Sequence, residues 1–239
     1  MHIEDVSYQA DGRTMIGHLA FDDDTQAGPR PAVLVSHEGP GLDQHARDVA
    51  EKLAAFGYVA FALDYNGNGV PLPADQVMAR VGELSADPER LARVATAGLE
   101  VLLAQAPADP ARVAAIGYCY GGVVSLELAR TRAEIKAVVG FHPGYLPPRP
   151  AHSARIRASV LMCSGTEDPF ATAEQRLAFE AEMRESGVAD WRLELYGGVG
   201  HSFTNPEVDR YAIPGCAYNA LADRRSWQSM LQLLGEVLT

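Results

Sequence analysis

The sequence predicts one doubly wound α/β domain over residues 1–239, with a mostly parallel sheet flanked by helices on both faces. Three observations predict this fold. Short apolar runs alternate with helical segments from residue 31 onward. The runs are nearly continuous rather than alternating, as in strands covered on both faces. A cysteine flanked by glycines also stands between an expected strand and an expected helix.

The expected elements follow one another in strand–helix alternation. Residues 16–21 alternate less clearly and form a candidate antiparallel edge strand. Strands are expected at 31–36, 58–63, 113–116 (after a turn signal at 108–110), 137–141, 159–163 and 191–196. Helices are expected at 43–56, from about 70 to 106 with a break near Asp87-Pro88, at 122–129 and at 221–237. The proline-rich stretch 147–150 is expected to be a surface loop, and no repeat or long linker divides the chain.

Composition and charge exclude several classes of function. A net charge of −11 argues against nucleic acid and anionic membrane surfaces as partners. No secretory signal and no apolar run of about 20 residues is visible, so a cytoplasmic protein is expected. Cys119, Cys163 and Cys216 are odd in number and widely spaced, which argues against a disulfide framework. No C-x-x-C or H-x-x-x-H pair is present, so no metal site is expected.

The pattern Gly117-x-Cys119-x-Gly121 is that of a nucleophile elbow in which sulfur replaces the serine oxygen. In an elbow the nucleophile occupies a strained backbone conformation, and side chains at the flanking glycines would collide across the turn. The alternative is a buried structural cysteine at a glycine-rich strand end. The expected strand before the motif and the expected helix after it favour the elbow.

A nucleophile needs a base, and the base needs an orienting acceptor. In the α/β-hydrolase fold these follow in the order nucleophile, acid, histidine. Asp168 and His201 supply that order, because each follows an expected strand. Taken singly, Asp168 is better explained as a turn residue before Pro169, and His201 can equally be a hydrogen-bonded imidazole at the surface or in the core. Glu167 is a second candidate for the acid.

The chemistry of this set follows from its pKa values. A free thiol has a pKa of about 8.5, so a neighbouring imidazole and a following helix N-terminus would increase its thiolate fraction. The backbone N–H groups of Tyr120 and Gly39 are the expected oxyanion hole. Strand-end positions also make Tyr65, Tyr145 and Phe203 candidate substrate contacts.

With these residues in view, the chain resembles the dienelactone hydrolase family of α/β-hydrolases. The matching text is Gly-Tyr-Cys-Tyr-Gly-Gly at 117–122, Gly-Thr-Glu-Asp-Pro at 165–169 and Gly-His-Ser-Phe at 200–203, together with Glu38. The resemblance extends from about residue 10 to the C-terminus. It implies hydrolysis of a small-molecule carboxylic ester or lactone by water, through an acyl-cysteine intermediate and without a cofactor.

The resemblance also assigns roles to residues outside the catalytic set. It implies that Glu38 interacts with the resting cysteine and controls when the thiolate becomes available. Without the resemblance, Glu38 is better explained as a loop carboxylate that caps the next helix. Arg80 is the candidate for a family arginine that precedes the elbow, its alternative being a solvated helix charge. Asn205 stands where family members acting on carboxylated dienelactones carry an arginine. This departure puts the carboxylated dienelactone in doubt as the substrate, because an amide is no charged clamp.

Other functions remain open at this point. A non-catalytic small-molecule receptor on a hydrolase fold is the main alternative, since fold does not fix function. A thiol redox sensor would use Cys163 or Cys216 near Cys119, and packing explains both of those residues equally well. A peptidase is less favoured. The oligomeric state is open, with a monomer as the working expectation.

Overall fold

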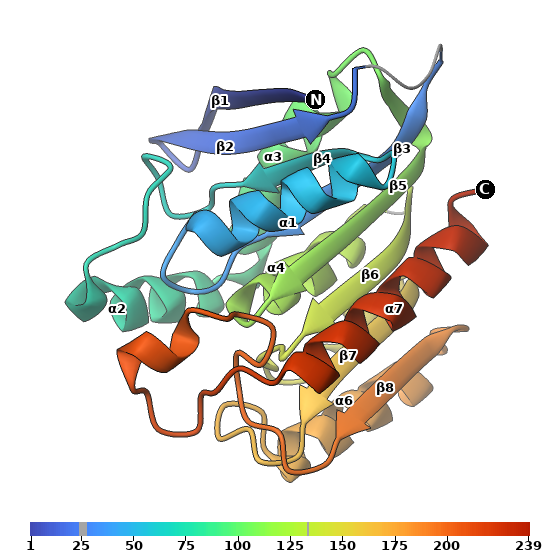
Figure 1. Cartoon of the computed structure of the whole chain (residues 1–239). Helices are drawn as coiled ribbons and strands as arrows, with labels where there is room; N and C mark the ends of the chain where they lie inside the picture. Colours follow the sequence, from blue (N-terminus) through green and yellow to red (C-terminus); the bar gives the residue numbers. More distant parts are fainter. Residues whose placement is uncertain (24–27, 133) are drawn as a thin grey trace.

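The computed structural model describes residues 1–23, 28–132 and 134–239. Within them an eight-stranded sheet runs in the order β1-β2-β4-β3-β5-β6-β7-β8 (Figure 1). β1 pairs antiparallel with β2 and β2 with β4, whereas all other pairs are parallel. The strands are β1 His2–Ala10, β2 Arg13–Phe21, β3 Arg30–Ser36, β4 Val59–Leu63, β5 Ala108–Tyr118, β6 Ile135–Phe141, β7 Ser159–Gly165 and β8 Trp191–Tyr196. The helices are α1 Gln44–Ala55, α2 Ala74–Ser85, α3 Pro88–Leu103, α4 Tyr120–Ala129, α5 Pro150–Ser153, α6 Ala173–Glu185 and α7 Ala220–Val237, with a 3₁₀ turn at Val208–Tyr211.

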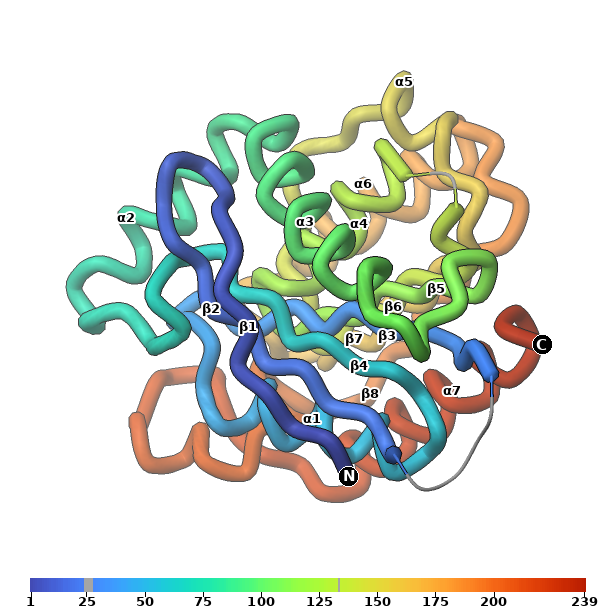
Figure 2. The backbone as a smooth tube through the Cα atoms, turned by 90° about the horizontal axis from the view of Figure 1, so that it is seen from above, coloured from blue at the N-terminus to red at the C-terminus, as the bar shows by residue number. Residues whose placement is uncertain are grey.

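Helices cover both faces of the sheet, as the continuous apolar strands predict. Helices α1 and α7 pack on one face, and α3, α4 and α6 pack on the other (Figure 2). Along β3, Leu34 enters the core under α3 and α4, while Val33 and Val35 enter the core under α1 and α7. Successive residues of a strand point to opposite faces, so both sets must be apolar. None of the described helices is long and apolar enough to cross a membrane.

The break expected near Asp87-Pro88 is confirmed as a helix boundary. α2 ends at Ser85, and the Asp87 side chain accepts a hydrogen bond from the N–H of Arg90 in the first turn of α3. Pro88 occupies the first helical position, where its missing N–H costs nothing. Asp43 caps α1 in the same way by accepting from the N–H of Ala46.

The N-terminal hairpin differs from the sequence expectation. Residues 16–21 lie in an antiparallel strand, but that strand pairs on both sides, and β1 is the edge. β1 lacks a clear apolar pattern because most of its side chains are exposed. Asp11 and Gly12 both have positive φ, at 55° and 69°, which is the signature of a type I′ hairpin turn. The Asp-Gly pair was therefore a signal for β1.

Two further elements depart from expectation. Helix α6 was not predicted, because its buried face includes Arg176 and Glu182 and so lacks an apolar period. Its capping box, in which Thr172 and Gln175 bond each other's backbone, is visible in the sequence. β5 begins at Ala108, so the expected turn at 108–110 belongs to the strand, with a register shift against β3.

We predict that Gly121→Ala destabilises the fold by about 3 kcal/mol, as overpacked backbone contacts do. A Cβ at Gly121 would lie 2.2 Å from the carbonyl oxygen of Ser36, which is a backbone atom. Gly235→Ala is the matched control, because no atom lies within 4 Å of its added Cβ and Gly235 is an exposed residue of helix α7. The control should raise the free energy of unfolding by about 0.5 kcal/mol. Urea denaturation of both variants measures this, and equal effects would contradict the steric argument.

Candidate active site

The turn between β5 and α4 holds Cys119 in a strained conformation. Cys119 has φ 53° and ψ −119°, and it directly precedes the first residue of α4. Gly117 and Gly121 flank it at close backbone approaches, because an added Cβ would lie 1.9 Å from the Gly121 oxygen and 2.2 Å from the Ser36 oxygen, respectively. The expected need for glycine on both sides of the cysteine is therefore confirmed. The turn leaves Cys119 partly exposed beside a cavity.

His201 and Asp168 meet next to this cysteine. The Nδ1 atom of His201 lies 2.7 Å from Oδ2 of Asp168, and both side chains are almost fully buried. The other carboxylate oxygen of Asp168 accepts from the N–H of Phe170 at 2.8 Å, which fixes the carboxylate plane. Glu167, the competing acid, is exposed and accepts from the hydroxyl of Thr166. The geometry thus favours Asp168 as the partner of the imidazole.

The electrostatics of His201 suit a thiolate partner. Burial lowers the pKa of His201, but the charge on the Cys119 sulfur and hydrogen bonds to Asp168 and Cys119 outweigh it and hold that pKa well above its usual value. A proton on His201 leaves a positive charge beside the sulfur. Such a charge is the common means by which proteins stabilise a thiolate at neutral pH.

Glu38 lies on the wall of the same cavity, and its environment is unusual for a carboxylate. Its Oε2 accepts from the Ser202 hydroxyl at 3.4 Å, while its Oε1 has no hydrogen-bond partner among the described residues. Burial and the negative charge of Asp43 raise the pKa of Glu38 to about 7, although His201, Ser202 and Asn205 lower it. Glu38 therefore changes charge close to neutral pH. The interaction with the resting cysteine that the resemblance implies stays a prediction.

His142 is a neighbour of the site to which no role was assigned from the sequence, although it stands at an expected strand end. It follows β6, has φ 40°, and its Nδ1 accepts from the backbone N–H of Cys119 at 3.1 Å. Its Nε2 therefore carries the proton and donates to the hydroxyl of Thr204 at 2.8 Å. Burial and the charges of His201 and His45 lower the pKa of His142 well below its usual value. Its place at the end of the strand paired with β5 was the available signal.

A cavity of about 330 Å³ lies over these groups. Its polar lining residues include Glu38, Cys119, Tyr120, His201 and Ser202. The remaining lining is Gly39, Pro40, Val77, Met78, Val81, Ser85, Val123, Gly144, Tyr145, Leu146, Phe170, Ile213 and Cys216. Both residues of the expected oxyanion hole, Gly39 and Tyr120, therefore border the cavity, and so does Tyr145.

Three of the expected substrate contacts are corrected, because Tyr65, Arg80 and Phe203 are buried outside the cavity lining. The hydroxyl of Tyr65 lies 2.8 and 2.9 Å from the carbonyl oxygens of His37 and Glu38. Tyr65 therefore stabilises the loop that carries Glu38 by hydrogen bonding to its backbone. Arg80 donates to the Tyr65 carbonyl at 2.9 Å and is not a solvated helix charge either. The Phe203 ring packs edge-on against His142.

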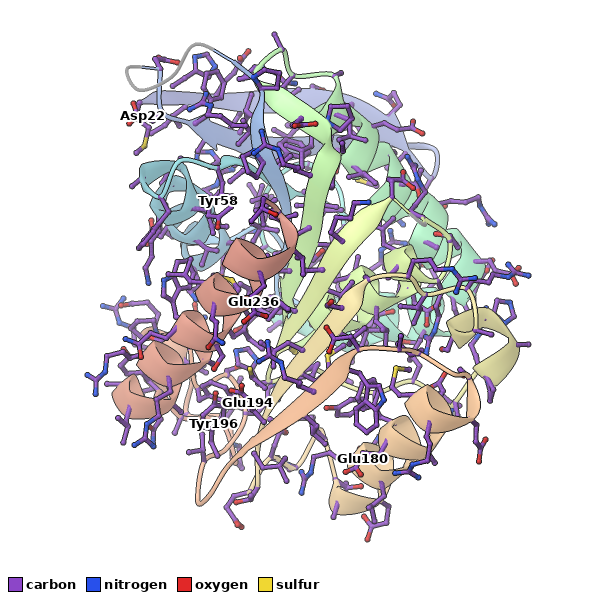
Figure 3. The ribbon with its side chains drawn as sticks, turned by 90° about the vertical axis from the view of Figure 1, so that its right-hand side faces the viewer. Asp22, Tyr58, Glu180, Glu194, Tyr196 and Glu236 are labelled. Carbon is purple, nitrogen blue, oxygen red and sulfur yellow. The ribbon has the colours of Figure 1, made fainter. Side chains whose placement is uncertain are left out.

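The two other cysteines occupy different environments. Cys163 is completely buried on β7, and its pKa is raised by burial. Its sulfur lies 4.0 Å from the Glu194 carboxylate, which accepts from the Tyr196 hydroxyl at 2.8 Å. Figure 3 shows Glu194 and Tyr196 between β8 and α7. Cys216 instead borders the cavity, where its backbone bridges to His201.

Comparison with known proteins identifies a matching family model and several related proteins. A family model described as "Dienelactone hydrolase family" matches residues 17–238. A crystal structure titled as a dienelactone hydrolase-like promiscuous phosphotriesterase from metagenomic libraries is 38% identical, with a TM-score of 0.95, over 100% of this chain and 99% of that one. A carboxymethylenebutenolidase of a Pseudomonas species is 28% identical over 89% of this chain and 92% of its own. A probable 2-oxo-3-(5-oxofuran-2-ylidene)propanoate lactonase of a Bradyrhizobium species is 27% identical over 95% and 91%.

We predict that Glu38→Gln stabilises the protein at pH 8. The folded-state pKa of about 7 lies above the usual 4.5, so Glu38 favours folding fully below pH 4.5 and loses this contribution as pH rises through 7. An amide removes the cost of burying the charge, which is about 3 kcal/mol for such a shift. Calorimetry at pH 8 should show a melting temperature several degrees above the native protein. The difference should shrink towards zero near pH 4.5, and a constant difference would assign the effect to packing.

Proposed function

Because the chain belongs to the dienelactone hydrolase family, we propose that it cleaves a carboxylic ester or lactone with Cys119 as the nucleophile. His201 serves as the base and Asp168 orients it. The observation that carries this proposal is the position of one imidazole between the Asp168 carboxylate, at 2.7 Å, and a cysteine held at a strained elbow. The family and its named members support the hydrolysis, and the cysteine mechanism is the proposed refinement.

The first half of the reaction forms an acyl-cysteine. His201 takes the proton of Cys119, and the thiolate attacks the carbonyl carbon of the ester. The negative charge that develops on the carbonyl oxygen is stabilised by the N–H groups of Gly39 and Tyr120. One such donor typically contributes about 3 kcal/mol to the transition state. When the intermediate collapses, the C–O bond breaks and His201 protonates the departing oxygen.

The second half returns the free enzyme. Water attacks the thioester while His201 accepts its proton, and the same two N–H groups hold the oxyanion. Breaking the C–S bond releases the carboxylic acid and regenerates Cys119 beside His201. Asp168 accepts a hydrogen bond from Nδ1 and keeps that nitrogen protonated, so that Nε2 alone exchanges protons.

Glu38 is proposed to gate the nucleophile, as the family resemblance implies. Its pKa of about 7 means that it can take up or release a proton in the pH range in which the thiol must ionise. Its Oε1 has no hydrogen-bond partner among the described residues, and it shares the cavity with Cys119. A carboxylate in this position competes with His201 for the thiol proton until substrate occupies the cavity.

We predict that Cys119→Ala and His201→Ala each lower kcat/KM for phenyl acetate by at least about 1,000-fold, since the members of such a unit act together. Mass spectrometry of the His201→Ala protein, incubated with a slow ester, should locate any added acyl mass at Cys119. A non-catalytic receptor would instead bind esters saturably without turnover. Full activity of Cys119→Ala would remove the cysteine mechanism and leave the fold assignment intact.

A second candidate reaction is hydrolysis of uncharged phosphotriesters. It is favoured by the 38% identity to a protein titled as a promiscuous phosphotriesterase and by a cavity whose described lining contains no lysine or arginine. The thiolate would attack phosphorus and expel an aryl alcohol that His201 protonates, after which water would release the phosphodiester.

We predict slow but measurable release of 4-nitrophenol from diethyl 4-nitrophenyl phosphate. The rate should fall to background in Cys119→Ala, because one nucleophile serves both reactions. Absorbance at 400 nm follows the product. Equal release by the native protein and the variant would exclude phosphotriester cleavage at Cys119.

A further inference from the structure

Apart from the His201 imidazole, whose charge faces the Cys119 sulfur, the ionisable groups around the cavity give it no positive side chain to bind an anionic substrate. Among the described lining residues, the charged or titratable ones are Glu38, Cys119, Tyr120, Tyr145, His201 and Cys216. No lysine or arginine is among them. A buried carboxylate on the wall, with one oxygen lacking a hydrogen-bond partner, makes the cavity still less favourable for a second anion.

The two polar residues that might have served an anion are engaged elsewhere. Arg80 is 5% exposed and donates to the Tyr65 carbonyl and to Glu83. Asn205 is buried and hydrogen-bonds to Glu38 and to the backbone of Glu207. Neither side chain borders the cavity. A substrate carboxylate would therefore lose water without gaining a partner.

Apolar side chains form the entrance. Met78 is 71% exposed, Phe170 47% and Ile213 44%, and all three line the cavity. Val77 and Val81 continue the α2 wall inward, where Val81 lies next to Gly39. Exposed apolar groups gathered at the mouth of a cavity mark a ligand-binding surface.

Phe170 lies where the alcohol half of a substrate must lie. Its ring centroid is 4.9 Å from that of His201, with an angle of 60° between the rings. His201 protonates the departing oxygen in the proposed mechanism, so the group attached to that oxygen leaves from beside Phe170. Aromatic rings at such distances gain from edge-to-face contact beyond the area they bury.

We infer that this site selects uncharged esters whose alcohol half is aromatic and packs on Phe170, and that it discriminates against substrates carrying a carboxylate. The inference rests on the proposed hydrolysis at Cys119 and adds the substrate class. It is carried by the composition of the cavity lining and by the place of Phe170 next to His201.

Two esters of equal shape test the charge. 4-Carbamoylphenyl acetate and 4-carboxyphenyl acetate differ by one negative charge at the far end of the leaving group. After division by each ester's hydroxide-catalysed rate, kcat/KM at pH 8 should favour the carbamoyl ester by at least about fivefold, since unpaired like charges oppose binding. A smaller ratio overturns the inference and leaves the hydrolase function standing. Absence of turnover of both esters overturns the hydrolase function and the inference with it.

A positive charge added at the cavity mouth gives a second test of the charge preference. Met78→Arg adds a cation at an exposed position on α2, and Met78→Gln is the matched uncharged control. The arginine variant should lower the carbamoyl-to-carboxyl ratio at least about threefold relative to the glutamine variant. Equal ratios in the two variants would mean that charge at the cavity mouth does not set selectivity.

The aromatic half of the inference has its own readout. Phe170→Ala should lower the ratio of kcat/KM for phenyl butanoate over ethyl butanoate by about fivefold, which an edge-to-face contact of this kind can supply. Leu177→Ala, which removes an exposed apolar side chain outside the cavity, should keep the native ratio. A general disturbance of His201 would slow both esters alike. An unchanged ratio in Phe170→Ala therefore overturns the assignment of Phe170.

Discussion

The close backbone contact between the β5–α4 turn and the end of β3 is the constraint on which the site depends. Gly121 lies so near the Ser36 carbonyl that no side chain fits between them. In the same turn Cys119 has positive φ and lies at the carboxyl edge of the sheet, where α4 begins. The same contact brings Gly39, in the loop after β3, beside Tyr120 at the start of that helix. The nucleophile and both expected oxyanion donors are thus positioned by one packing contact.

The pKa values of the titratable groups around the Cys119 sulfur are shifted in different directions by burial and by neighbouring charges. His142 and His201 are neighbouring imidazoles, yet the pKa of the first is lowered by burial and that of the second is raised by the Cys119 sulfur and Asp168. His142, with the lowered pKa, accepts from the Cys119 backbone N–H, while His201, with the raised pKa, faces the Cys119 sulfur. Glu38, between these extremes, has a pKa of about 7. Titratable groups whose pKa values are pushed apart in this way are typical of acid–base catalysis.

The other polar side chains near the cavity bind to groups of the protein itself. Arg80 supports the carbonyl of Tyr65, and Tyr65 in turn supports the loop that carries Glu38. The Asn205 side chain interacts with Glu38 and lowers its pKa. These side chains are therefore not available to bind a substrate. The cavity lining combines a few polar residues with many apolar ones. An uncharged ester suits this lining, because only its carbonyl group needs polar partners.

The sequence by itself determined the fold class and the ordered set Cys119, Asp168 and His201. Both follow from local chemistry, since apolar strands, glycines at a tight turn and residues just after strands are all readable along the chain. The sequence did not determine which aromatic and basic residues reach the cavity. Tyr65 follows an expected strand and Arg80 lies in an expected helix, so both were candidates for the cavity. Tertiary packing instead buries both side chains, which donate hydrogen bonds to backbone carbonyls. Only the tertiary structure decided the position of Phe170 beside His201 and the absence of lysine and arginine among the described residues of the lining, because these depend on segments far apart in sequence.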